Sequence, residues 1–153
     1  MTNTLKYSLI DRLHFPLAKK FYQAFYPSGK ANKADPIWVL NQEQKILVCL
    51  RLKQFKQCQL LTGMVTHPDF RNQGLGLQLL DSLINDETQP LANKACYCFA
   101  FSHLEGFYQK AHFLSICPDE LPDELRTRFM AYSQAGKLLI PMKFSNLTTE
   151  RSK

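Results

Sequence analysis

The chain lacks any long apolar run. None of its 153 residues belongs to a stretch approaching the roughly eighteen apolar residues that a membrane-spanning helix needs. The first residues, M-T-N-T-L-K-Y-S, also lack the apolar segment of a signal peptide. We therefore expect a cytoplasmic protein with no membrane partner.

Metal-binding spacing is missing as well. The five cysteines are odd in number, no two of them form a C-x-x-C pair, and the four histidines are not spaced as zinc ligands. We expect no metal site, and we expect reduced, structural thiols. Strand-like runs contain Cys49, Cys96, Cys98 and Cys117, and Cys58 lies near one.

Positive charge is in excess but not concentrated. Lysine and arginine number 19 against 13 acidic residues, a formal charge of +6, which suits an acidic partner. The basic residues are scattered, and no aromatic and basic stripe of the kind that stacks on bases is evident. A solvated basic surface is the simpler interpretation, and a nucleic-acid-binding protein is a distant alternative.

Composition and length favour one globular domain. Apolar content of 45% and charged content of 21% are ordinary for a soluble globular protein. The length allows a full core, and no internal repeat or linker divides the chain. We expect a single domain over residues 1–145, followed by a polar C-terminal tail at 146–153.

The most informative stretch joins an apolar strand to a leucine-rich helix through a loop with two glycines. It reads M-V-T-H-P-D-F-R-N-Q-G-L-G-L-Q-L-L, from Met64 to Leu80. One helical stripe follows, made of Leu75, Leu79, Leu80, Leu83 and Ile84. Glycine lets the backbone approach a ligand, and the first turn of a helix offers N–H groups to an anion. The pattern predicts a helix start that binds phosphate.

Two common nucleotide motifs do not fit this loop. A P-loop needs G-x-x-x-x-G-K-[ST], and no such Lys-Ser/Thr pair is present. The dinucleotide fingerprint G-x-G-x-x-G fails because Leu79 stands three residues after Gly76.

Two segments instead resemble the GNAT family of N-acetyltransferases. The run P-x-x-R-x-x-G-x-G, at Pro68, Arg71, Gly74 and Gly76, resembles the family's motif A. About thirty residues on, F-Y-Q-K-A-H-F at 107–113 resembles the F-Y-x-K-x-G-F segment that ends the family's acetyl-CoA site. One departure is His112, which stands where the family has glycine.

The resemblance implies the acyl-CoA N-acyltransferase fold, a mixed α/β (α+β) architecture. Helices should flank a mostly antiparallel sheet of six to seven strands with one parallel, splayed pair, between which the pantetheine arm lies. Alternating and apolar runs predict strands at 4–10, 36–40, 46–52, 58–66, 95–101, 113–117 and 138–144. The parallel pair would be formed by the fourth and fifth of these strands, joined through the leucine-rich helix.

Two further helices have clear apolar stripes. The first begins near residue 14 or 15 because Pro16 is tolerated only in a first turn, and Asp11 could cap it. Its expected buried stripe is Leu13, Leu17, Phe21 and Phe25. A helix over 122–134 should bury Leu121, Leu125, Phe129 and Tyr132, and Gly136 is a plausible C-cap.

Carried onto this sequence, the family motifs assign an acetyl-CoA site. Backbone N–H groups from Asn72 to Leu77 would face the pyrophosphate, with Arg71 beside it, and the strand end would bond the pantetheine and the thioester oxygen. The cofactor-binding residues so implied are Met64, Val65, Thr66, Arg71, Asn72, Gln73, Gly74, Leu75, Gly76, Leu77 and Tyr108.

The same resemblance makes Tyr108 the general acid that protonates the departing thiolate. A phenol with pKa about 10 suits a thiolate with pKa about 8.5, whereas in isolation the residue would be read as packing beside Phe107. The general base is open. The strand before the loop, residues 59–66, holds no carboxylate, so Glu105, His103 or a water relay remain, and His67 is interpreted as a turn residue.

The predicted function is transfer of an acetyl group from acetyl-CoA to an amine in a ternary complex. The acceptor is a small molecule or a protein amino group, chosen by the first helix, the 30–35 loop and the end of the chain. In the loop, Lys30 and Lys33 could meet an acidic acceptor or stay solvated. A longer acyl group remains open. The main alternative is an acyl-CoA-binding sensor without catalysis. A monomer or a homodimer paired through the C-terminal strand would fit.

Overall fold

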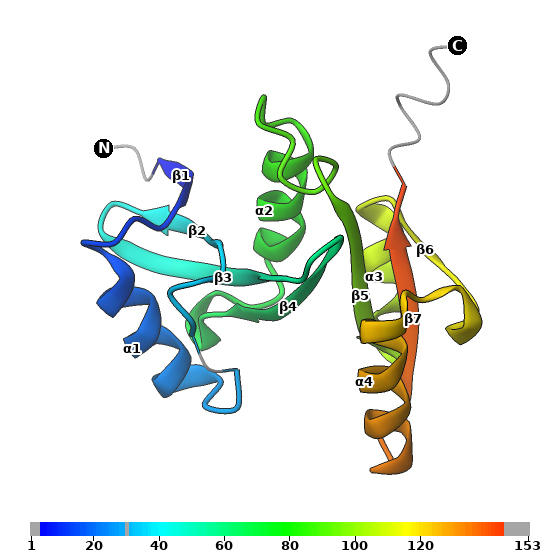
Figure 1. Cartoon of the computed structure of the whole chain (residues 1–153). Coiled ribbons are helices and arrows are strands. Elements are labelled where there is room, and N and C mark those ends of the chain that lie inside the picture. The colour runs from blue at the N-terminus through cyan, green and yellow to red at the C-terminus, as the bar shows by residue number, and fades with distance from the viewer. Residues whose placement is uncertain (1–3, 30, 146–153) are drawn as a thin grey trace. The chain divides into compact units, whose positions relative to one another are not determined.

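The computed structural model describes residues 4–29 and 31–145 (Figure 1). The strands are β1 (Leu5–Leu9), β2 (Ile37–Gln42), β3 (Lys45–Gln54), β4 (Cys58–Thr66), β5 (Ala95–Phe101), β6 (Phe113–Ser115) and β7 (Leu139–Phe144). The α-helices are α1 (Phe15–Phe25), α2 (Leu75–Ile84), α3 (Glu105–Lys110) and α4 (Asp123–Gln134), with 3-10 turns at Pro68–Phe70, Ser102–Leu104 and Pro118–Glu120. Within the described ranges, no helix combines the length and apolarity needed to cross a membrane.

The strands form one mixed sheet in the order β1-β2-β3-β4-β5-β7-β6. Pairing is antiparallel for β1 with β2, β2 with β3, β5 with β7, and β6 with β7. The sheet is mostly antiparallel with one parallel pair, and β5 is the neighbour of β4, as the sequence predicted. The C-terminal strand is not an edge, however, because β7 lies between β5 and β6. Our prediction that it could pair as an edge strand in a homodimer is therefore wrong.

The chain divides into two compact units. The first contains the described residues up to Gln54 together with Leu61–Leu83. The second contains Phe55–Leu60 and the described residues from Ile84 onward. The boundary at residue 145 stays a prediction, since the polar tail at 146–153 lies outside the described residues.

In the first unit, the buried stripe of α1 matches the prediction only in part, since Phe21 is buried and Phe25 packs against the same core. The buried side chains are Ala18, Phe21 and Tyr22, whereas Leu13 is 81% and Leu17 47% exposed. Pro16 fixes the helix start at Phe15, so Leu13 precedes the helix. The helix therefore presents an arc centred on Phe21 and Tyr22, and Leu17 falls outside it.

The core of the first unit forms between α1 and strands β2 and β3. It is a cluster of Ala18, Phe21, Tyr22, Ile37, Val39, Ile46 and Cys49, with Val65 of β4 packed against it. A nearly buried ion pair accompanies it, in which Arg51 Nε lies 3.2 Å from Asp35 Oδ2. The other oxygen of that carboxylate accepts a 2.9 Å hydrogen bond from the Gln54 amide, so the loop before β2 is tied to β3.

In the second unit, helices pack on both faces of the strands (Figure 1). Tyr97 and Phe99 of β5 pack against Phe129 of α4. On the other side, Tyr108 of α3 meets Phe113, whose ring contacts Phe144 of β7. The predicted stripe of α4 is confirmed for Leu121, Leu125 and Phe129, which are 0–5% exposed, while Tyr132 is half-buried.

The end of α4 follows the predicted capping. Gly136 has φ +88°, its amide donates to the Ser133 carbonyl, and the Lys137 amide donates to the Tyr132 carbonyl. This pair of bonds is a Schellman motif, which needs a left-handed residue after the helix. The glycine is therefore required by backbone conformation.

Two short segments differ from prediction. The hairpin between β2 and β3 turns over residues 43–44 alone, with Glu43 at φ +56°, because both strands extend into the polar run. The strand predicted at 113–117 ends at Ser115, since Pro118 opens a 3-10 turn. Cys117 is consequently exposed, whereas Cys49, Cys58, Cys96 and Cys98 are buried, and none of these five cysteines forms a disulfide.

Buried Cys49 predicts loss of stability at alkaline pH. Burial raises the pKa of its thiol from 9.0 to about 12, so the native state retains a proton that the unfolded chain loses. Stability is fully present below pH 9 and falls as pH rises toward 12, with a slope that approaches about 1.4 kcal/mol per pH unit. Urea unfolding in reductant at pH 8 to 10 should show a shallower decline in Cys49→Ala than in wild type. Equal slopes in both proteins would contradict this assignment.

Candidate functional site

The loop between β4 and α2 is anchored at its start. The His67 amide donates to the Leu47 carbonyl at 2.7 Å, which fixes the chain directly after Thr66. His67 Nδ1 accepts a 3.1 Å hydrogen bond from the Asp69 amide and so stabilises the 3-10 turn. Its ring lies 4.7 Å from that of Phe25 and 5.4 Å from that of Phe70. These contacts are those of a turn residue, as interpreted from the sequence.

Two left-handed residues turn the loop into the helix. Asn72 has φ +65° and Gly74 has φ +74°, a conformation that asparagine tolerates and glycine adopts without strain. A Cβ at Gly74 would meet nothing within 4 Å, so this glycine is needed for its conformation and not for space. The Gly74 carbonyl accepts a 3.0 Å bond from the Gln78 amide, the first bond of α2.

The start of α2 has the general features of helix starts that bind anions. The amides of the first helical turn have no partner within the helix and lie at the positive end of its dipole. Left-handed residues just before a helix form concave arrangements of N–H groups. Arg71 adds a cation beside them, while its Nε donates to the Thr66 carbonyl at 3.3 Å. The loop residues that the sequence assigned to the pyrophosphate therefore lie together, and Met64, Val65 and Thr66 are half-buried at the strand end that leads into it.

Tyr108 lies in the second unit on α3. Its side chain is 7% exposed, and its ring makes edge contacts with Phe107 at 5.0 Å and Phe113 at 5.8 Å. These contacts fix the ring plane, because both neighbours pack at angles near perpendicular. Tyr108 is therefore a packed core residue, and it is also the residue to which the sequence assigns the catalytic role.

His112 has a left-handed backbone conformation of the kind that favours glycine. It has φ +69°, and its carbonyl accepts a 2.8 Å bond from the Ser145 amide. His112 thus forms the turn between α3 and β6. Histidine is among the residues that tolerate left-handed backbone better than most, so the local fold is kept.

The candidates for a general base differ in their surroundings. Glu105 is half-buried and its carboxylate accepts a hydrogen bond from the Ser115 hydroxyl. His103 is exposed and stacks on Phe101 with ring centroids 6.0 Å apart. Of the two acceptor-loop lysines, Lys33 lies 5.8 Å from the Phe15 ring centroid, and Lys30 lies outside the described residues.

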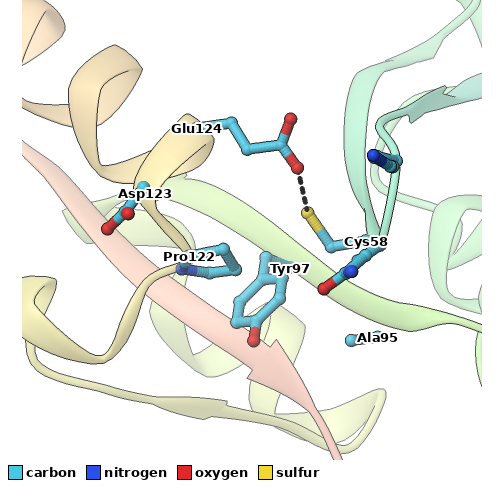
Figure 2. A pocket seen from close by; sticks show the side chains of 8 residues that line it. Cys58, Ala95, Tyr97, Pro122, Asp123 and Glu124 are labelled. Atoms are coloured by element: carbon cyan, nitrogen blue, oxygen red, sulfur yellow. Dashed lines mark hydrogen bonds between the residues drawn. The ribbon is translucent and has the colours of Figure 1, made fainter.

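The second unit also contains a pocket that the sequence did not predict (Figure 2). Its volume is about 460 Å³, and it is lined by Lys56, Gln57, Cys58, Ala95, Tyr97, Pro122, Asp123 and Glu124. The Cys58 thiol donates to the Glu124 carboxylate at 3.8 Å. Burial, followed by the charge of Glu124, raises the pKa of that thiol. The lining carries charges of both signs and so does not define one class of ligand.

A comparison with family models identifies the family. Residues 33–114, more than half of the chain, match the model described as "Acetyltransferase (GNAT) domain". This chain therefore belongs to the GNAT acetyltransferase family. Among curated proteins, none matches its sequence.

Solved structures of acetyltransferases share the fold. The ribosomal-protein-S18-alanine N-acetyltransferase of Escherichia coli matches with a TM-score of 0.62 and 16% identity over 92% of this chain and 93% of that one. Arabidopsis thaliana Naa50, in complex with the bisubstrate analogue CoA-Ac-MVNAL, matches with 0.55 and 13% over 74% of this chain and 85% of its own.

A longer protein also contains this fold. The N-acetylglutamate synthase of Neisseria gonorrhoeae, in complex with coenzyme A and N-acetyl-glutamate, matches with a TM-score of 0.61 and 14% identity over 94% of this chain. The present chain spans 35% of that protein's length. At these identities the three likenesses show the fold alone.

The left-handed turn at His112 predicts an ordered set of stabilities. His112→Gly should unfold within about 1 kcal/mol of wild type, because relief of backbone strain offsets the added freedom of the unfolded chain. His112→Val should be about 1–2 kcal/mol less stable than His112→Gly, since a β-branched residue is poorly tolerated at positive φ. Urea denaturation of the three proteins measures the order. A valine variant as stable as the glycine variant would contradict the assignment.

Proposed function

We propose that this protein transfers an acetyl group from acetyl-CoA to an amine by direct attack within a ternary complex. The observation that carries the proposal is the loop from Arg71 to Gly74, whose left-handed Asn72 and Gly74 leave the first-turn amides of α2 for an anion. Coenzyme A carries a pyrophosphate that suits this site. Bound coenzyme A in the Neisseria synthase and the bisubstrate analogue in Naa50 support the same co-substrate and a ternary complex here.

The chemistry needs three contributions from the chain. The amine nitrogen attacks the thioester carbonyl carbon, and the carbon–sulfur bond breaks as the tetrahedral intermediate collapses. By family resemblance, backbone N–H groups of Met64 to Thr66 stabilise the oxyanion, and Tyr108 gives its proton to the leaving thiolate. The amine loses its proton to Glu105, to His103 or to water, the three candidates that the sequence leaves.

A sensor without catalysis is the second candidate. Residues 59–66 of β4 contain no carboxylate to act as a base, and His112 departs from the motif around Tyr108. Such a module would bind acetyl-CoA through the same loop without transferring its acetyl group. Binding and turnover therefore have to be measured on the same preparation.

Tyr108→Phe should separate a general acid from a packing residue. The ring and its aromatic contacts remain, so acetyl-CoA binding should change less than about threefold. The turnover number should fall by about 10²-fold, since general acid catalysis contributes this order of magnitude. Product formation should be followed by chromatography of coenzyme A and mass spectrometry of the amide, because exposed Cys117 would react with thiol reagents.

The assay would use a panel of small primary amines and peptides with free N-termini. Tyr132→Phe is the matched control, because Tyr132 is a half-buried tyrosine that also packs edge-on against a phenylalanine, Phe99. Acetyl-CoA binding without acceleration by any amine would favour the sensor. An unchanged turnover number in Tyr108→Phe would contradict the general-acid role. If wild type instead binds nucleic acid with steep salt dependence, the distant alternative gains support.

A further inference from the structure

A tyrosine on α1 is bonded to the backbone of β4 just before the strand end. The Tyr22 hydroxyl donates a 2.7 Å hydrogen bond to the Gly63 carbonyl, across 41 positions of sequence. Tyr22 is 2% exposed, so water does not compete for this carbonyl. The next three residues along β4 are Met64, Val65 and Thr66, which the family resemblance assigns to the pantetheine and the thioester.

Gly63 is required both for its conformation and for space. It has φ +61°, a left-handed residue inside a strand, and such a residue disrupts the regular ladder and redirects the backbone after it. A Cβ at this position would lie 3.0 Å from the Tyr22 hydroxyl and 3.3 Å from its ring. The left-handed Gly63 in β4 and the Tyr22 side chain are therefore in close contact that leaves little room for a side chain at position 63.

The surroundings keep Tyr22 protonated and in place. Burial, followed by the neighbouring Cys49 thiol, raises the pKa of Tyr22 well above its ordinary value, although the charge of Arg51 acts in the opposite direction. The phenol is thus a hydrogen-bond donor throughout the physiological range. Val65 packs against the same cluster that contains Tyr22, which gives β4 a second contact with this core.

The strand end itself has less support from burial. Met64, Val65 and Thr66 are half-buried, whereas the residues of β4 from Cys58 to Leu61 are buried. A backbone that must present N–H and C=O groups to a ligand needs a fixed geometry, because small displacements weaken such contacts strongly. The hydrogen bond from the Tyr22 hydroxyl to the Gly63 carbonyl fixes the backbone at the point where the buried part of β4 ends.

We propose that Tyr22 is a positioning residue for acyl-CoA: its hydroxyl fixes the Gly63 carbonyl and thereby orients the backbone of Met64 to Thr66 toward the pantetheine arm. The inference rests on the proposed function, since it assumes that acyl-CoA binds at this strand. Tyr22 itself does not touch the reacting atoms. It acts through the direction that it gives to the strand.

The test compares two ligands by isothermal titration calorimetry. Acetyl-CoA carries the pantetheine arm, while adenosine 3′-phosphate 5′-diphosphate carries the same nucleotide phosphates without it. Tyr22→Phe keeps the ring and removes the hydroxyl. It should weaken acetyl-CoA binding about tenfold, the ratio that one buried hydrogen bond supplies, and leave the nucleotide within about twofold.

Two further variants complete the design. Tyr26→Phe, at the C-cap of α1 four residues after Tyr22 and 36% exposed, is the matched control and should change neither affinity. Gly63→Ala brings a Cβ to 3.0 Å from the Tyr22 hydroxyl at a left-handed position, so it should displace the Gly63–Tyr22 contact and cause the same selective loss of acetyl-CoA affinity. It also supplies the comparison if Tyr22→Phe fails to fold.

The outcomes are distinct. Selective loss of acetyl-CoA affinity in Tyr22→Phe and Gly63→Ala supports the positioning role. Equal loss for both ligands, or no loss beyond that of Tyr26→Phe, overturns it while leaving acetyl-CoA binding by wild type intact. If wild type binds neither ligand, the proposed function fails, and the inference fails with it.

Discussion

The structure of the candidate site depends on one backbone constraint. Between Thr66 and Leu75 the chain must leave a strand, reverse direction and begin a helix with its first amides available to an anion. L-amino acids avoid the left-handed conformation that this path needs, and Asn72 and Gly74 provide it. No side chain fills the space next to Gly74, so a ligand can approach the backbone itself.

The strand end from which that loop starts is fixed, because hydrogen bonds from other elements hold the end of β4. Leu47 of β3 accepts from the His67 amide on one side of the strand end, and Tyr22 of α1 donates to Gly63 before it. In the second unit, Tyr108 has a comparable rigidity, since Phe107 and Phe113 fix its ring. Electrostatic stabilisation of a transition state works best from groups that do not reorganise. The hydrogen bonds at the end of β4 and the ring contacts of Tyr108 hold the candidate groups of this chain in this way.

Much of this arrangement could be predicted from the sequence. The bounds of β4 and β5 agree with prediction, because each is an apolar run bounded by strong turn signals, and the predicted leucine stripe lies on α2. The loop residues follow from the two glycines and the family motif. The left-handed turn at His112 had one signal, the glycine missing from the motif.

Other features could not be predicted, since they depend on contacts distant in the sequence. Tyr22 occupies an apolar helical position, and nothing local shows that its hydroxyl reaches Gly63. Leu13 and Leu17 fit a helical stripe but are exposed, because Leu13 precedes the helix and Leu17 lies outside the arc of Ala18, Phe21 and Tyr22 that is buried. The position of β7 between β5 and β6 likewise depends on the strand order, which the local sequence does not specify.

Thermal unfolding with and without acetyl-CoA tests the central claim most directly. In wild type, acetyl-CoA at about a hundred times its Kd should add roughly 2.7 kcal/mol and raise Tm by several degrees. Gly74→Glu should lose this shift because a carboxylate repels the pyrophosphate, while Gly74→Gln, equally strained but neutral, should keep part of it. A wild-type Tm that does not move, or a shift that Gly74→Glu retains in full, would contradict a coenzyme A site on this loop.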